Sequence, residues 1–273
     1  DNPDSACQPP STKDFLVDRT FRALARVGVV LVLALVFALV YEVGRKALPG
    51  IEKHGFDVLL GSVWDVNQGK YGILPAIWGT LYSAFIALLI AGFFGVSMAI
   101  FLTQDFLPAR LAAVFRTIVE LLAAIPSVVY GLWGIYVVIP AIRPLTTWLN
   151  SELGWIPFFG TSLSGPGLLP AALVLAIMIL PTIAAVSQDA LTSVPMKTKQ
   201  AAYGMGTTHW EAILKVMVPS AATGIFGSLV LGLGRALGET MALAMLVGNA
   251  NTISVSLFAP ANTLAALLAL NFP

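Results

Sequence analysis

The chain has 273 residues, of which 58% are hydrophobic and 11% are charged, whereas soluble domains have about 45–50% and about 25%. The apolar residues come in long uncharged runs, so the composition indicates a membrane protein and argues against a soluble enzyme. The formal net charge of +1, with scattered Lys and Arg, argues against a nucleic-acid partner. The single cysteine, Cys7, excludes an intrachain disulfide and a multi-cysteine metal site.

The N-terminal part is predicted to be a polar tail (residues 1–20), a first membrane helix (residues 21–42) and an outer loop (residues 43–70). The uncharged run of the helix is short for a bilayer, unless Arg22 and Arg26 extend to the membrane surface. A signal peptide is the alternative, because a basic start precedes the apolar run. No small-x-small cleavage site follows and further spans do, which favours an uncleaved anchor.

Four more crossings are expected, because charges are costly in hydrocarbon and about 20 apolar residues cross the bilayer. They lie within residues 71–104, 117–142, 166–188 and 220–247. We expect the residues after 247 to form a hairpin or half helix on the outer side, because Pro260 divides them, although a sixth span is an alternative. The fold class is therefore an all-α, multi-pass integral membrane bundle.

The distribution of Lys and Arg sets the orientation, because cytoplasmic segments carry the excess. With the N-terminus inside, nine of these residues lie in inner segments and five in outer ones. The inner residues are Lys13, Arg19, Arg22, Arg26, Arg110, Arg116, Lys197, Lys199 and Lys215, and the outer ones are Arg45, Lys46, Lys53, Lys70 and Arg143. The sequence therefore predicts a cytoplasmic N-terminus.

The inner loop between the fourth and fifth spans, residues 189–219, has a pattern of its own. It predicts a helix over residues 197–203, a turn containing Gly204 and Gly206, and a second helix from about Thr208. This loop either docks another protein or merely links two spans. The two histidines, His54 and His209, are expected in loops and solvated, and neither has a second ligand at metal spacing, so no metal is expected.

The same loop resembles the EAA loop of bacterial ATP-binding-cassette (ABC) importer permeases. The matching positions are Gln200, Ala201, Ala202, Gly206 and Pro219. In that family the loop is the coupling helix, which docks into a groove of the cytoplasmic ATPase. The resemblance implies the same role here for these residues, with small side chains allowing close docking. Gln200 stands where the family has Glu, which removes a charge.

Three further stretches, residues 61–80, 120–134 and 232–249, resemble the permeases of phosphate-specific importers, of the PstC type rather than the PstA type. The resemblance implies a type I importer permease core over residues 71–273, with a sixth span expected beyond the end of this chain. It implies a bacterial plasma (inner) membrane location. It also implies three partners: a second, PstA-type permease, an ATPase dimer that holds ATP and Mg, and an extracytoplasmic phosphate-binding protein.

Arg235 and Glu239 are the only charges deep inside an apolar run. Each costs about 2.5–3.5 kcal/mol at a helix centre on insertion scales, so both need partners inside the bundle. Their i, i+4 spacing predicts one helix face, where they either form an ion pair that holds helices together or line a substrate pathway. Arg suits phosphate, because its planar fork donates two parallel hydrogen bonds. Glu239 could hold Arg235 in place or accept the proton of hydrogenphosphate, which sulfate lacks.

Three hydrogen-bonding side chains are further candidates for the pathway: Ser127, Tyr130 and Thr240. Ser127 follows Pro126, which frees backbone carbonyl groups and opens the helix locally. The alternative for each residue is ordinary hydrogen bonding between helices.

The chain contains no G-x-x-x-x-G-K-[ST] loop, since its only Gly-Lys pair, Gly69-Lys70, precedes Tyr71. An ATP-driven transporter would therefore need the ATPase on a separate chain, and no enzyme activity or cofactor is expected on this one. The rival is an ion- or proton-coupled secondary transporter. That class needs coupling carboxylates in the membrane and an inverted repeat, whereas only Glu239 lies deep and no convincing repeat is visible.

Overall fold

The computed structural model describes residues 12–65, 68–104 and 106–271. The N-terminal elements are α1 (Thr12–His54), α2 (Asp57–Leu60), β1 (Trp64–Asp65), β2 (Lys70–Tyr71), α3 (Leu74–Thr103) and α4 (Ala109–Ala124). The central elements are α5 (Ser127–Trp133), the π-helix η2 (Gly134–Val138), α6 (Ile139–Leu153) and α7 (Leu168–Thr192). The last elements are α8 (Met196–Gly204), α9 (His209–Glu211), the π-helix η3 (Ala212–Met217), α10 (Val218–Ser220), α11 (Ala222–Leu237), α12 (Met241–Leu246) and α13 (Leu264–Asn271).

The chain divides into two units, residues 1–58 and 59–273. The first unit is built on α1, a continuous helix of 43 residues. The predicted first span, residues 21–42, lies inside it, and the helix also takes up the first part of the predicted outer loop, as far as His54. Its large apolar side chains are exposed, from Phe15 to Ile51. An apolar helix that is unburied over its whole length is what a lipid-facing span requires.

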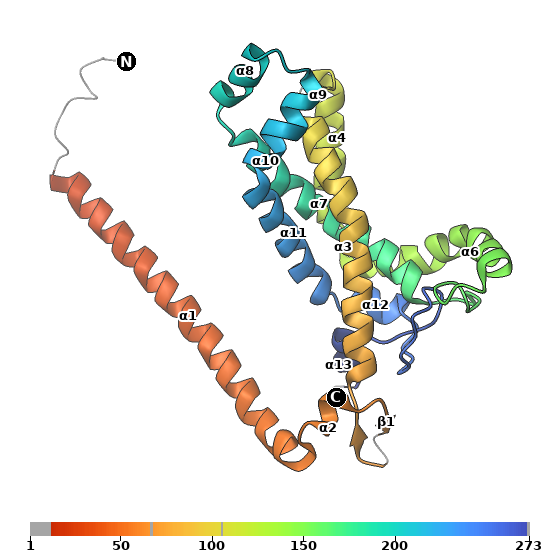
Figure 1. Cartoon of the computed structure of the whole chain (residues 1–273). Helices are drawn as coiled ribbons and strands as arrows, with labels where there is room; N and C mark the ends of the chain where they lie inside the picture. The colour runs from red at the N-terminus through yellow and green to blue at the C-terminus, as the bar shows by residue number, and fades with distance from the viewer. Residues whose placement is uncertain (1–11, 66–67, 105, 272–273) are drawn as a thin grey trace. The chain divides into compact units, whose positions relative to one another are not determined.

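The second unit is organised around α3, α7 and α11, which pack along one another (Figure 1). The buried face of α3 is made of small residues, among them Gly79, Ala84, Ala87 and Ala91. Small residues let membrane helices approach closely, so their backbones and methyl groups supply the packing. One buried hydrogen bond joins α7 to α11, with Ser187 Oγ and Ser228 Oγ 2.8 Å apart. The predicted second and fourth spans, within 71–104 and 166–188, correspond to α3 and α7.

The third predicted span, within residues 117–142, is wrong as one continuous helix. The structure ends α4 at Ala124 and begins α5 at Ser127, with extended backbone at Ile125 and Pro126. Proline lacks the N–H that continues a helix, and the residue before it is pushed out of the helical region. The helix long and apolar enough to cross a membrane is instead Ser127–Leu153.

The fifth predicted span, within residues 220–247, is also broken. The segments His209–Ser220 and Ala222–Leu237 form a candidate span only as a pair, with a bend of 68° between them. α11 then ends at Leu237, and α12 begins at Met241. Counting the bent pair, the described residues contain up to five candidate spans, and the predicted multi-pass helical bundle is confirmed.

After α12 the chain forms a loop, and the last part of this loop folds back on the end of α12 before α13 begins. Gly248 pairs with Ala261 as an isolated bridge, and the Ala261 N–H donates to the Val247 carbonyl at 2.9 Å. Gly248 has φ +93°, a conformation that side chains with a Cβ rarely adopt, and it lies close to Pro260. The segment after residue 247, expected to be a hairpin or a half helix, is this loop followed by the short helix α13. The short antiparallel pair β1–β2 precedes α3 on the same unit.

Candidate functional site

Arg235 lies near the end of α11, 13 residues after Ala222, which is about 20 Å along the helix axis. Its guanidinium is exposed within this chain, and Nη1 donates a hydrogen bond to Thr182 Oγ1 at 2.9 Å. Thr182 follows Pro181, a buried proline inside α7. The two helices thus hold one cationic group within otherwise apolar candidate spans, and charge is costly in a membrane.

An open recess of about 630 Å³ surrounds this arginine. It is lined by Thr182, Gly227, Val230, Leu231, Gly234 and Arg235. A Cβ added at Gly227 or Gly234 would meet no atom within 4 Å, so this face of α11 is left uncovered by the second unit. The side chains that line the recess are apolar apart from the Thr182 hydroxyl and the Arg235 guanidinium. The lining therefore contains, among the described residues, no carboxylate that would compete with a bound anion for the guanidinium.

The predicted helical pairing of Arg235 with Glu239 is wrong. Glu239 lies after the end of α11, because the backbone leaves the helix at Gly238. Glu239 Oε1 instead accepts a hydrogen bond from the Ala242 N–H, at 3.2 Å, in the first turn of α12. A carboxylate at a helix N-terminus is stabilised by the unpaired N–H groups there. Within the described residues no ion pair joins the two charges, so Glu239 does not hold the guanidinium in place.

The other predicted pathway residues lie on elements next to Glu239. α5 packs on α12, where a Cβ added at Gly131 would come within 3.3 Å of the Ala242 Cα atom. Tyr130 is buried on α5, and its hydroxyl donates to the Leu122 carbonyl at 2.8 Å, which bridges the break before Ser127. Tyr130 therefore holds α4 to α5 instead of offering a free hydroxyl.

Ser127 and Thr240 are half-buried, one at the start of α5 and the other just before α12. The Thr240 hydroxyl donates to the Gly238 carbonyl at 3.4 Å, a long hydrogen bond. The structure thus places Ser127 at the start of α5 and Thr240 next to Glu239, whereas the hydrogen-bond partner of Arg235 is Thr182 on α7.

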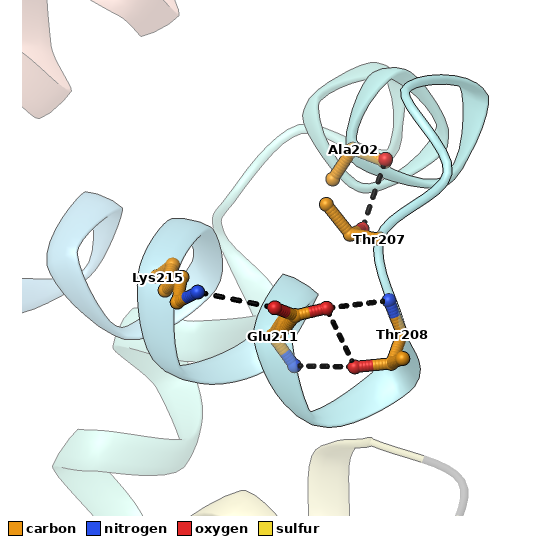
Figure 2. A network of polar contacts seen from close by, with 5 residues as sticks. All are labelled: Ala202, Thr207, Thr208, Glu211 and Lys215. Atoms are coloured by element: carbon orange, nitrogen blue, oxygen red, sulfur yellow. Dashed lines mark hydrogen bonds and ion pairs between the residues drawn. The ribbon is translucent and has the colours of Figure 1, made fainter.

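The predicted helix-turn-helix is confirmed in the segment 189–219 (Figure 2). Gly206 has φ +82°, and the Thr207 hydroxyl donates to the Ala202 carbonyl at 2.9 Å across the turn. Thr208 and Glu211 then form a reciprocal capping box at the start of α9, with Lys215 donating to Glu211 Oε1 at 3.1 Å. The segment is therefore a pre-formed structure rather than a loose link.

The five residues predicted to contact the ATPase differ in their exposure. Gln200, Ala201, Gly206 and Pro219 are exposed. Ala202 is 1% exposed, so it packs within this chain, and the prediction that it faces another protein is wrong. Its small side chain is needed where α8 folds back on the segment that follows.

His209 was expected to be solvated in a loop, which is also wrong. It occupies the first turn of α9, Nδ1 lies 2.6 Å from the Tyr203 hydroxyl, and Nε2 lies 3.1 Å from the Gln104 carbonyl. His54 is the last residue of α1 rather than a loop residue. Two further residue sets are not among the sequence-based candidates. Thr182 is marked in the sequence only by a hydroxyl next to Pro181 in an apolar run. The capping box at the start of α9 is indicated by the pattern Thr208-x-x-Glu211.

Comparisons with known proteins agree with this architecture. The family model described as binding-protein-dependent transport system inner membrane component matches residues 93–270. The phosphate transport system permease protein PstC of Mesorhizobium japonicum is 40% identical over 265 residues, which cover 94% of this chain and 80% of that protein. The PstC protein of Pasteurella multocida is also 40% identical, over 262 residues that cover 94% of this chain and 82% of that protein.

Among solved structures, an inward-facing MetNI methionine ABC transporter matches with a TM-score of 0.50 and 21% sequence identity. The match covers 73% of this chain and 80% of that one, and at this identity it supports the fold alone. The all-α ABC importer permease fold is thereby confirmed. The chain belongs to the family of binding-protein-dependent transport system inner membrane components, and PstC permeases are among its relatives there.

Proposed function

We propose that this chain is the permease subunit of an ATP-driven importer of inorganic phosphate. The observation that carries the proposal is Arg235, a permanent cation on α11 that faces an open recess and, among the described residues, donates a hydrogen bond only to Thr182. An unneutralised guanidinium at this depth needs an anion, and its planar fork matches two oxygens of phosphate. The PstC relatives support phosphate as that anion.

We propose that the Glu239 carboxylate accepts a hydrogen bond from the protonated oxygen of hydrogenphosphate. Glu239 Oε1 accepts a hydrogen bond from the Ala242 N–H, and the Arg235 guanidinium donates to Thr182. The carboxylate is therefore not engaged in an ion pair with the guanidinium. Within the described chain Glu239 Oε2 has no hydrogen-bond partner. A carboxylate accepts the proton of hydrogenphosphate but repels fully ionised sulfate, which gives a basis for discrimination. Ser127 and Thr240 would add neutral donors along α5 and α12, and Tyr130 would support them by closing the α4–α5 break.

Energy would come from separate ATPase chains that hold ATP and Mg, because this sequence has no phosphate-binding loop of its own. We call residues 189–219 the coupling segment, and four of its exposed residues are the proposed contact with the ATPase: Gln200, Ala201, Gly206 and Pro219. Ala202 would stabilise α8 by packing, buried, against the rest of this chain. A PstA-type permease would complete the pathway across the α11 face, and an extracytoplasmic phosphate-binding protein would deliver the substrate.

We further propose that the N-terminus is cytoplasmic, which puts α8 and α9 on the cytoplasmic side with the ATPase. The excess of Lys and Arg in the segments on that side supports this orientation, in the inner membrane that the family description names. The rival, an ion-coupled secondary transporter, is disfavoured because the chain belongs to a binding-protein-dependent family.

The test compares phosphate uptake by the wild type with that of Arg235→Lys, per inserted transporter. Lysine keeps the charge but loses the fork, so a bidentate phosphate contact predicts at least a tenfold loss. Arg143→Lys is the matched control, since Arg143 also donates one hydrogen bond, to the Ser164 carbonyl at 3.2 Å, but lies on α6. Equal uptake by Arg235→Lys and the control would remove Arg235 from the phosphate path.

A further inference from the structure

His209 joins two elements that are far apart in the sequence. Its Nε2 lies next to the backbone carbonyl oxygen of Gln104. A carbonyl oxygen can only accept a hydrogen bond, so Nε2 carries the proton and donates. In the neutral ring Nδ1 then accepts a hydrogen bond from the Tyr203 hydroxyl, at 2.6 Å. One imidazole therefore connects α8, through Tyr203, with the C-terminal end of α3, which is capped by Gln104.

Aromatic packing holds this imidazole in place. Phe106 lies edge-on to the His209 ring, with 4.8 Å between ring centroids, and also packs on Trp210 at 4.7 Å. Gln104 as a residue is 2% exposed, so the part of the chain that carries the acceptor carbonyl is enclosed as well. We call Tyr203, His209, Trp210, Gln104 and Phe106 the His209 cluster.

The His209 cluster gives α3 a direct contact with the coupling segment. α7 and α11 are joined to that segment by short stretches of chain, at residues 193–195 and through α10. α3 ends about 100 residues earlier and reaches the segment through side chains such as His209, which contacts Gln104 over a separation of 105 residues. Movement of α8 would therefore pass to α3 through this cluster.

The opposite end of α3 is also fastened by side chains. The Trp78 indole N–H donates to the Ser254 carbonyl at 2.9 Å, and the Tyr82 hydroxyl donates to the Val255 carbonyl at 2.8 Å. The Leu264 N–H donates to Thr80 Oγ1 at 2.9 Å. α3 is one uninterrupted helix of 30 residues, about 45 Å long, so it links the two ends of the unit (Figure 1).

We propose that His209 is a positioning residue that fastens the coupling segment to α3, and that α3 relays movement between this segment and the loop 254–264 at the other end. The inference rests on the proposed function, which assigns the coupling segment to the ATPase on the cytoplasmic side. The loop at the opposite end of α3 then lies on the side of the binding protein. α3 is thereby identified as the element through which a loaded binding protein stimulates ATP hydrolysis.

The experiment uses the full transporter in liposomes, with the ATPase, the second permease and the phosphate-loaded binding protein. His209→Phe keeps a ring against Phe106 but loses both hydrogen bonds, and His209→Gln restores an amide donor for the Gln104 carbonyl. We expect His209→Phe to assemble and keep its basal ATP hydrolysis, while stimulation by the binding protein and phosphate uptake both fall at least fivefold. His209→Gln should recover part of that stimulation.

Removing one hydroxyl provides a milder variant and its matched control. Tyr203→Phe should lower stimulation two- to fivefold, whereas Tyr136→Phe, whose side chain is 74% exposed on η2, should behave as the wild type. Tyr203→Phe decides the matter if His209→Phe fails to assemble. Stimulation equal to that of the wild type in a correctly assembled Tyr203→Phe or His209→Phe complex overturns the role of His209.

The relay through α3 is tested by combining the two ends. Trp78→Phe removes the indole N–H, and it should also lower stimulation by the binding protein. If α3 links the ends, the double variant with His209→Phe should be no lower than the worse single variant. Losses that multiply would refute the relay. A wild-type complex that takes up no phosphate would refute the proposed function, and this inference with it, whereas a normal wild type with unaffected variants refutes the inference alone.

Discussion

Gly79 is the position where α3 comes closest to the loop that follows α12, and an alanine there should force the two apart. A Cβ on residue 79 would lie 2.0 Å from the Asn262 carbonyl oxygen and 3.1 Å from its carbonyl carbon. Both are backbone atoms, so no side chain can rotate out of the way. Restoring an ordinary contact of 3.4 Å requires a separation of at least about 1.4 Å.

That separation determines the size of the effect. Three hydrogen bonds fasten the loop to α3 next to this glycine, at 2.9, 2.8 and 2.9 Å, through Trp78, Tyr82 and Thr80. A shift of more than 1 Å takes such bonds beyond useful length, and each contributes about 0.5–1.5 kcal/mol. Gly79→Ala should therefore cost about 2–4 kcal/mol of the free energy that holds the loop on α3.

The assay is chemical labelling of a buried loop position. Cys7 is the only native cysteine, so a Cys7→Ser background carrying Ser256→Cys reports on the loop, since Ser256 is 5% exposed. With a hydrophilic maleimide, Gly79→Ala should raise the labelling rate at least tenfold and lower the melting temperature in detergent. Gly92→Ala is the matched control on α3, because its added Cβ meets only the end of the flexible Leu229 side chain, at 3.0 Å.

The control should label as slowly as the background. Unchanged labelling in Gly79→Ala, with a melting temperature within 1 °C of the control, would show that the helix and the loop do not approach as closely as described.

Three further changes have expected outcomes. Gly206→Ala should destabilise the coupling turn by about 1–2 kcal/mol, measured by thermal unfolding, because residue 206 has φ +82°, whereas Gly204→Ala, in open space at the end of α8, should be neutral. Ser187→Ala should lower the stability of the α7–α11 packing by only about 0.6 kcal/mol, since Ser228 keeps its hydrogen bond to the Ile225 carbonyl, and a loss above about 2 kcal/mol would contradict this. Glu239→Gln should weaken the exclusion of sulfate in a phosphate-uptake competition at matched protein levels, because an amide donates to an oxyanion without a proton, and unchanged exclusion would refute the proton-acceptor role.

Elements governed by local sequence were predictable. The long apolar runs of α3 and α7 gave two spans, and the glycine turn and the helix after Thr208 followed from residues within a few positions of one another. The break at Pro126 was visible in the sequence too. A proline alone does not predict the end of a membrane helix, because such helices often tolerate it.

The site depended on features that local patterns do not contain. The helix ends at Gly238, although glycine is common inside membrane helices, and this one break removes the i, i+4 relation between Arg235 and Glu239. The partner of Arg235 is on α7, and the partner of His209 is 105 residues away on the chain. Contacts of this range arise from packing, so composition and periodicity suggest the residue types but not the pairs.

The role of this chain in ATP-driven phosphate import can be measured as phosphate accumulation in liposomes that contain this chain, the second permease and the ATPase, with the binding protein inside or outside. We expect labelled phosphate to enter only with ATP on the ATPase side and the binding protein on the opposite side, and we expect Arg235→Lys to abolish most of the uptake at equal protein density. Accumulation driven by an ion gradient without ATP, or uptake that is equal for Arg235→Lys and the wild type, would contradict these expectations.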